Sequence, residues 1–148
     1  MPASTRVDFY ILQTSEPNSR MQFACRLTEK AYGLGNTVYA HAPSEQDADR
    51  LDDLLWTFRQ GSFVPHDALH KCAAEQELAT PVSIGTPDTR QQEAQLLINL
   101  TEETPDFVTK FGRIAEIVDS SEASRKAGRQ RFKDYKKLGL EPETHTIK

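Results

Sequence analysis

Stretches with strand-like and helix-like patterns alternate through the first 58 residues of the chain. Residues 7–12 (VDFYIL) form an apolar run rich in aromatic and β-branched side chains, and residues 37–42 (TVYAHA) form a second. Apolar residues recur at helical spacing over 21–32 and 48–58, the latter behind Ser44, a residue suited to cap a helix. This β-α-β-α order predicts a parallel sheet with right-handed crossovers, and hence an α/β fold.

The remaining sequence continues this pattern after a less regular stretch at residues 61–87. Three more strands are predicted, at residues 81–85 (PVSIG), 94–100 (AQLLINL) and 113–118 (RIAEIV). Pro105 suits the first position of a short helix, and a final helix is predicted between a cap within 119–121 and a stop at Gly139. We therefore expect residues 1–148 to form a single α/β domain, a mostly parallel sheet flanked by helices.

Composition and the start of the chain indicate a soluble protein. Hydrophobic residues make up 37% of the chain and charged residues 27%, as in many globular domains. No apolar run approaches the roughly 18 residues of a membrane span, and the opening MPASTRVDFYIL lacks a signal-peptide layout. Cys25 and Cys72 show no disulfide spacing, and Cys25 suits a small buried hydrophobe on a helix. We expect a cytoplasmic protein with reduced thiols and no membrane contact.

The sequence lacks the phosphate-binding turn of nucleotide-binding α/β proteins. Such proteins hold phosphate on the backbone N–H groups of a glycine-rich turn between the first strand and the first helix. Here residues 13–20 (QTSEPNSR) contain no glycine, and Glu16 would repel phosphate. A G-x-S-x-G nucleophile motif is also missing, and neither cysteine lies in an activating setting. The prediction is a nucleotide-binding-like topology without a phosphate loop, a catalytic site or a cofactor.

Histidine and acidic residues suggest a metal site only weakly. His66, His70 and Cys72 could converge on a metal ion if their segment were helical, but no further ligand cluster matches them. The simpler interpretation is a set of polar side chains on a surface connection, and no metal site is predicted. Four aspartates around the second helical pattern are interpreted as a solvated face: Asp47, Asp49, Asp52 and Asp53.

An aromatic cluster ends the second helical pattern, in the stretch LLWTFRQGSFVPH. Trp56 is the only tryptophan and stands at the end of the helix, with Phe63 in the connection that follows. Trp56 could be a core residue that closes the helix against the sheet. It could equally belong to an exposed patch, because aromatic side chains on a rigid element make good interface anchors. The residues alone leave both alternatives open.

The last helical segment concentrates positive charge. Residues 121–138 hold seven Lys or Arg side chains and two acids, a net charge of +5, whereas residues 1–120 have a net charge of −8. Four cations form a row at helical spacing: Arg125, Arg129, Lys133 and Lys137. Arg131 and Lys136 are expected to widen this row on other faces, and Phe132 and Tyr135 to interleave with it.

The helix dipole accounts for only part of this charge. Cations near a helix C-terminus gain about 0.3–1 kcal/mol each, which explains Lys136 and Lys137. Arg125 and Arg129 lie in the N-terminal half, where positive charge is disfavoured, so they indicate an acidic partner. A chain with a net charge of −4 would repel a long nucleic acid away from this patch, whereas a short acidic peptide touches the patch alone. The peptide is the favoured partner, and any DNA contact is expected to be indirect.

Several segments resemble the chi subunit of the bacterial DNA polymerase III holoenzyme. They are the strand VDFYIL, the helix end RLDDLLWTF with the following SFVPH, the strand AQLLINL, and the later segments PDFVTKFGRIAEIVD and RQRFKDYKKLGL. The resemblance covers nearly the whole chain. It implies a non-catalytic accessory subunit of the clamp-loader complex. Such an adaptor binds the acidic C-terminal tail of single-stranded DNA-binding protein and links it to the replicase through the psi subunit.

The resemblance also implies a binding site for that tail. Five residues belong to it: Arg129, Lys133, Phe132, Val118 and Arg125. Arg129 and Lys133 would take the carboxylates of the tail, and Val118 and Phe132 would border a pocket for its terminal phenyl ring. Phe132 stands where a relative has tyrosine, so a hydroxyl hydrogen bond to the tail is absent here.

Trp56 and Phe63 are implied in binding psi, or an accessory DNA helicase that competes with psi in some relatives. An alternative function of a different class is a nucleotide-dependent or nucleic-acid-processing enzyme on the same α/β frame. The missing phosphate loop argues against it.

Overall fold

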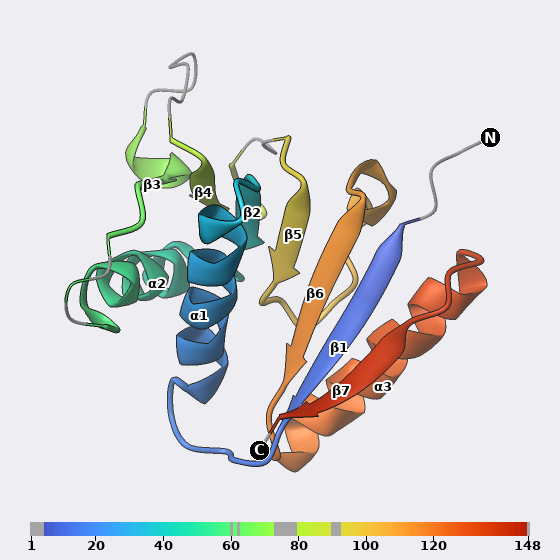
Figure 1. Ribbon diagram of the computed structural model, residues 1–148. Helices are drawn as coiled ribbons and strands as arrows, with labels where there is room; N and C mark the ends of the chain where they lie inside the picture. The colour runs from blue at the N-terminus through green and yellow to red at the C-terminus, as the bar shows by residue number, and fades with distance from the viewer. Residues whose placement is uncertain (1–4, 60, 62, 73–79, 90–92, 148) are drawn as a thin grey trace.

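The computed structural model describes residues 5–59, 61, 63–72, 80–89 and 93–147. Within them the chain forms one seven-stranded sheet in which every pairing is parallel, in the order β3-β4-β2-β5-β6-β1-β7 (Figure 1). The strands are β1 (Arg6–Leu12), β2 (Val38–His41), β3 (His66–Ala68), β4 (Val82–Gly85), β5 (Leu96–Asn99), β6 (Arg113–Val118) and β7 (Glu143–Ile147). The helices are α1 (Ser19–Gly33), α2 (Glu45–Thr57) and α3 (Glu122–Lys137), with 3-10 turns η1 (Leu69–Lys71) and η2 (Val108–Lys110). The predicted α/β class is confirmed.

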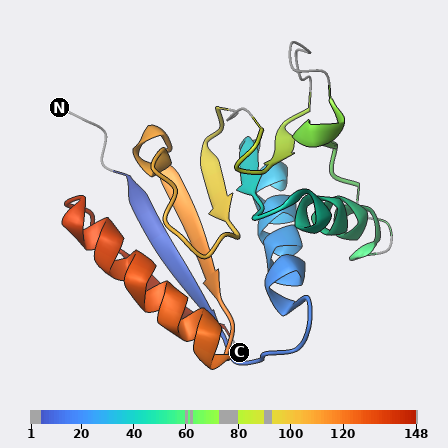
Figure 2. The same ribbon diagram turned by 180° about the vertical axis from the view of Figure 1, so that it is seen from behind.

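Helices cover both faces of the sheet. The helices α1 and α2 pack on one face, called here the front face, while α3 lies on the rear face behind β6 and β1 (Figures 1 and 2). Because α1 and α2 carry the chain from β1 to β2 to β3, toward one edge, right-handed crossovers place both on the same face. The helix α3 leads from β6 to β7 toward the other edge, so it lies on the opposite face.

Alternation along the strands builds a core on each face. In β5, Ile98 points to the front core with Cys25 and Leu51, and Leu97 points to the rear core with Tyr135. Burial raises the pKa of the Cys25 thiol to about 12. The prediction that Cys25 is a buried hydrophobe is therefore confirmed.

Helix ends follow the sequence signals. The Ser44 hydroxyl oxygen accepts a hydrogen bond from the backbone N–H of Asp47 at 3.2 Å, and Ser121 caps α3 in the same way through Ser124 N–H at 3.2 Å. Each such cap contributes about 1 kcal/mol. Gly139 follows α3 with a φ of +84°, a left-handed conformation that favours glycine. The predicted caps and stop are confirmed.

The two edge strands and one short helix differ from the prediction. The strand β3 lies in the stretch that had no regular pattern, and β7 pairs with β1 beyond the last predicted helix. The short helix expected to begin near Pro105 is only η2, a single 3-10 turn at Val108–Lys110 that starts after Pro105. Within the residues described, no helix is long and apolar enough to cross a membrane.

Candidate functional site

A small notch opens between α3 and the strands beneath it. It has a volume of about 220 Å³ and is lined by Phe9, Ile11, Val118, Arg125, Gly128 and Arg129. The strands β1 and β6 supply an apolar floor, and α3 supplies two exposed guanidinium groups at the rim. The structure thus brings Val118, Arg125 and Arg129 together, three of the residues selected from the sequence.

Gly128 lets α3 approach the sheet at this notch. A Cβ atom at this position would lie 2.8 Å from Val118 Cγ2, closer than such atoms normally come. Glycine inside a helix costs about 1 kcal/mol relative to alanine, so its presence in the middle of α3 reflects this close packing. The sequence analysis missed Gly128, although a glycine inside a charged helix was a signal that could have identified it.

Phe132 and Lys133 have different positions relative to the notch. The Phe132 ring is half-buried and packs on Phe9, with 5.3 Å between ring centroids, so it supports the notch through a lining residue. Lys136 Nζ lies 5.6 Å from the centroid of the Phe132 ring on the outer side. Lys133 is exposed one helical turn from Arg129 and is not part of the lining.

Arg131 does not widen the surface row, so that prediction is wrong. Its Nε donates to Glu116 Oε1 at 2.8 Å and its Nη1 donates to the backbone oxygen of Glu102 at 3.0 Å. Glu116 Oε2 also accepts from Tyr135 Oη at 2.5 Å and from Asn99 Nδ2 at 3.0 Å. Burial raises the pKa of the Glu116 carboxyl, and these donors and the Arg131 charge oppose that rise. The network ties α3 to β5 and β6 and removes one cation from the surface.

Three exposed cations of α3 have no ion-pair partner among the described residues, although Glu122 and Asp134 lie on the same helix. Arg125, Arg129 and Lys133 form no ion pair with any residue that the structure describes. Arg125 lies near the positive end of the helix dipole, whereas Arg129 is in the middle of α3. An anion bound at the notch would pair with both unpaired guanidinium groups.

Trp56 and Phe63 form an exposed aromatic pair. Trp56 is 50% exposed and Phe63 is 64% exposed, and their ring centroids are 5.5 Å apart. The inner side of Trp56 packs on His66 at 4.6 Å between centroids. The alternative that Trp56 is a core residue is wrong, and the exposed-patch alternative is confirmed. The pair lies near β3, at the other end of the sheet order from β7 and α3.

The histidines after the aromatic pair bind aspartates of α2. His66 Nε2 lies 2.8 Å from Asp52 Oδ1, and His70 Nε2 lies 2.8 Å from Asp49 Oδ1. Their segment is β3 and η1 instead of a helix, so the imidazoles bind separate carboxylates and do not converge on one ion. Two earlier interpretations are corrected in part. His66 is buried on β3, where Asp52, with a side chain only 16% exposed, holds β3 to α2. Asp49 pairs with His70 but remains 48% exposed, so for Asp49 the interpretation as a solvated residue stands.

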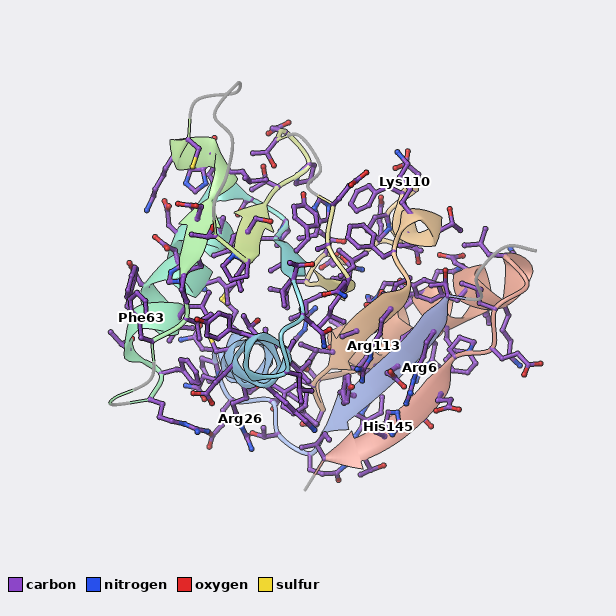
Figure 3. All side chains as sticks on the ribbon, turned by 45° about the horizontal axis from the view of Figure 1, so that its top comes forward. Arg6, Arg26, Phe63, Lys110, Arg113 and His145 are labelled. Atoms are coloured by element: carbon purple, nitrogen blue, oxygen red, sulfur yellow. The ribbon has the colours of Figure 1, made fainter. Side chains whose placement is uncertain are left out.

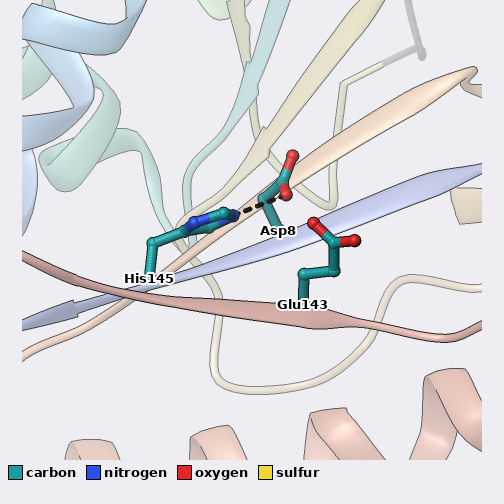
Figure 4. A group of neighbouring side chains, drawn as sticks. All are labelled: Asp8, Glu143 and His145. Carbon is teal, nitrogen blue, oxygen red and sulfur yellow. Dashed lines mark hydrogen bonds and ion pairs between the residues drawn. The ribbon is translucent and has the colours of Figure 1, made fainter.

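Asp8, Glu143 and His145 are close enough to share a metal ion (Figure 4). However, the buried Asp8 carboxylate already contacts His145 Nε2 at 2.8 Å, Arg6 Nε at 3.1 Å and Arg113 Nε at 3.4 Å. Two guanidinium groups beside the carboxylate would repel a metal cation. The cluster is therefore a set of ion pairs that joins β7 to β1 and β6.

The carboxyl ends of β2, β4 and β5 border a hollow of about 920 Å³. Ligands of open α/β sheets bind at this kind of edge. Its rim carries four acids: Asp47, Glu102, Glu103 and Asp106. The Arg20 guanidinium is engaged with the backbone oxygens of Ile117 at 3.0 Å and Leu100 at 3.4 Å. The hollow is unsuited to a nucleotide phosphate, in agreement with the missing glycine-rich turn.

Comparison with known proteins identifies relatives across the whole chain. Residues 4–143 match the family described as DNA polymerase III chi subunit, HolC. The chain is 41% identical to DNA polymerase III subunit chi of Pseudomonas aeruginosa, with 97% of each chain covered. It is 30% identical to subunit chi of Haemophilus influenzae, covering 94% of this chain and 95% of the relative. For subunit chi of Escherichia coli the identity is 29%, covering 86% of this chain and 85% of the relative.

Solved structures of the DEAD-box protein Dbp5 have a similar fold. Its C-terminal domain aligns with a TM-score of 0.61 at 13% identity, covering 98% of this chain and 91% of that domain. A longer S. cerevisiae Dbp5 chain bound to Gle1 aligns with a TM-score of 0.65 at 13% identity, covering 99% of this chain and 43% of that chain. At this identity the likeness extends to the fold alone. The family match and the 41% identity establish that the chain belongs to the DNA polymerase III chi subunit family of replication accessory subunits.

Proposed function

We propose that this chain is a cytoplasmic adaptor that binds the acidic C-terminal tail of single-stranded DNA-binding protein and links it to the replicase through psi. The observation that carries the proposal is the notch, where Arg125 and Arg129 stand over an apolar floor that includes Val118. Such a site matches a peptide end with carboxylates and one apolar side chain. Arginine can bind a carboxylate through two parallel hydrogen bonds.

The exposed Trp56–Phe63 pair is the proposed contact for psi, or for an accessory DNA helicase. Aromatic anchors supply large contact area at low entropic cost and dominate many interfaces. The pair and the notch lie toward opposite ends of the sheet order, so the two proposed contacts share no residue. This separation supports a bridging role.

We also propose that the chain has no catalytic activity of its own. The acidic rim at the carboxyl ends of the strands and the turn without glycine both oppose a phosphate-bearing substrate. A nucleotide hydrolysis assay on the purified protein tests this. Activity that copurifies with the wild type and disappears on a point substitution in this chain would contradict the proposal.

Titration with the cognate tail peptide tests the adaptor proposal. Fluorescence anisotropy should show saturable binding that weakens as salt is raised, because screening shortens the reach of exposed charges. Deleting the terminal Phe of the peptide should weaken binding as much as replacing its acids, since the notch is both apolar and cationic. Binding that is indifferent to the terminal Phe would contradict a role for the notch.

A further inference from the structure

Part of the front face of the sheet has no helix over it. The helix α1 lies over β2 and β6 and reaches β1 through Phe23, which packs on Tyr10 at 5.2 Å between ring centroids, whereas β7 has no helix over it on this face (Figures 1 and 3). Parallel strands are normally buried on both faces, and α3 buries β6 and part of β1 on the rear face, whereas Thr144 and Thr146 of β7 are exposed there. The uncovered region is therefore a place where the fold has room for another element.

A groove follows α1 along this uncovered region. It has a volume of about 760 Å³, more than three times that of the notch at about 220 Å³. Its walls are apolar side chains from α1 and from the strands, chiefly Phe23, Leu27, Tyr10, Ala115 and Ile147. Concave apolar sites of this size with a few polar groups at the rim are typical of ligand-binding sites.

The rim of this groove is basic. Arg26, Lys30, Arg59 and Arg113 border it, four of the ten basic residues within a 1–120 stretch of net charge −8. Arg59 is paired with Glu29 at 3.0 Å, and Arg113 with the buried Asp8 at 3.4 Å.

Arg26 and Lys30 are exposed on α1, and neither forms an ion pair with a residue in the described part of the chain. The Arg26 guanidinium lies 5.9 Å from the centroid of the Phe23 ring, at the mouth of the apolar wall. Arg26 and Lys30, which have no ion-pair partner among the described residues, therefore lie beside the apolar wall of the groove, as Arg125 and Arg129 lie beside the apolar floor of the notch.

We propose that this α1 groove is a second binding site for an acidic peptide that carries an apolar anchor, independent of the notch at α3. Charge complementarity selects the occupant, since carboxylates would meet Arg26 and Lys30 while the anchor enters between Phe23 and Ile147. The groove would bind the same class of ligand as the proposed tail site, an acidic peptide, and only this choice of ligand rests on the proposed function. The acidic balance of the rest of the chain disfavours a long nucleic acid at this site.

A titration on four forms of the full chain separates the two sites. The forms are the wild type, the notch variant Arg125→Ala/Arg129→Ala, the groove variant Arg26→Ala/Lys30→Ala, and the two combined. The probe is a peptide of aspartates ending in phenylalanine, and its partner probe ends in glycine. Alanine is the best helix former, so these exposed changes should leave the helices intact. Lys110→Ala, on η2 away from the groove, is the control for the loss of one positive charge (Figure 3).

The wild type should bind two peptides per chain, and the notch variant one. In the notch variant, peptide-induced NMR shifts should concentrate at Leu27, Ala31 and Ile147, and Arg26→Ala/Lys30→Ala should weaken the remaining binding about five- to tenfold. Lys110→Ala should stay within about twofold, and the glycine-ended probe should bind weakly.

Binding to the notch variant, its response to the groove substitutions and the oligomeric state can each overturn the inference. If the notch variant binds no peptide, the notch is the peptide site, as the proposed function requires, and the groove does not bind peptide. If Arg26→Ala/Lys30→Ala does not weaken the peptide binding that remains in the notch variant, the peptide does not bind in the groove. Sedimentation that shows a dimer with the groove covered by a second copy would also contradict the inference. Loss of binding in the groove variant alone, with the notch variant unaffected, would instead refute the proposed tail site and uphold the groove.

Discussion

Arg131 Nε donates to Glu116 Oε1 across 2.8 Å in the interior between α3 and β6, and both side chains are almost completely buried. This pair fixes which side of α3 faces the sheet. Arg125 and Arg129 are consequently turned to the notch and to solvent. A helix that looks uniformly basic thus has one structural cation and a separate set that is available for binding.

Replacing Arg131 by Met should lower the free energy of unfolding by about 3–5 kcal/mol, because Glu116 would remain buried without its cation. Denaturant unfolding measures the effect. Lys133→Met, on the exposed side of the same helix, is the matched control and should change stability by no more than about 0.5 kcal/mol. Equal, small effects in both variants would show that the pair does not anchor α3.

Arg129→Ala should weaken tail-peptide binding by about 1.5–3 kcal/mol, because a charge-assisted contact is lost. Stability should change little, since the side chain is exposed. Lys136→Ala and Lys137→Ala remove the same charge near the helix C-terminus and should do far less. Anisotropy titrations at one salt concentration compare the three. If the three variants bind the peptide equally well, the cations of α3 face solvent without contacting the peptide.

Gly128→Ala should close the notch, because the added Cβ would meet Val118 Cγ2 at 2.8 Å. Overpacking should lower the free energy of unfolding by about 1–3 kcal/mol, and the higher helix propensity of alanine should raise it by about 1 kcal/mol. The net change in stability should therefore be small. Peptide affinity should fall about tenfold. Val118→Ala in the same chain restores space and should recover part of the binding in a double-mutant cycle. If Gly128→Ala binds the tail peptide as tightly as the wild type, the terminal phenyl ring of the peptide does not bind in the notch.

Trp56→Ala and Phe63→Ala should each weaken a replicase-side partner by about 2 kcal/mol while leaving tail binding intact. Because both rings are at least half exposed, the stability loss should stay below the 3–5 kcal/mol or so of a core aromatic truncation. Copurification with psi and thermal melts measure the two effects. Unchanged psi binding in both variants would remove this surface from the proposed bridge.

His41 should make the protein less stable in mild acid. Burial lowers the pKa of His41 in the folded state, so the unfolded chain, with a histidine pKa of about 6.5, binds the proton more tightly. Stability contributed by neutral His41 is present above that unfolded pKa and is lost as pH falls below it. The difference in unfolding free energy between wild type and His41→Gln should therefore shrink from about pH 7 to about pH 5. A constant difference would mean that the folded pKa of His41 is not lowered.

The local elements were predictable because their signals lie close together in sequence. Ser44 and Ser121 cap α2 and α3 where expected, and the apolar runs at residues 7–12 and 113–118 are neighbouring strands. Such signals depend on a few adjacent residues, so the spacing of residues in the sequence is enough to predict them.

Contacts between distant residues were not predictable. Spacing placed Arg131 on the surface of α3, because nothing in the helix itself indicates that Glu116 lies beneath it. In the same way, nothing near Asp52 in the sequence indicates that His66 of β3 lies against its carboxylate. The exposure of Trp56 depended on which residues pack around the end of α2, and the sequence left that undecided.

The edge strands also determine how this sheet meets other proteins. An exposed edge with unpaired backbone groups invites another strand, and with it aggregation. Here one edge is β3, only three residues long, and the other is β7, a five-residue strand that begins with Glu143 and has polar side chains up to Ile147. Strand-to-strand association is disfavoured at both ends. The partners proposed above would then be bound by side-chain surfaces, the notch and the Trp56–Phe63 pair, and not by an added strand.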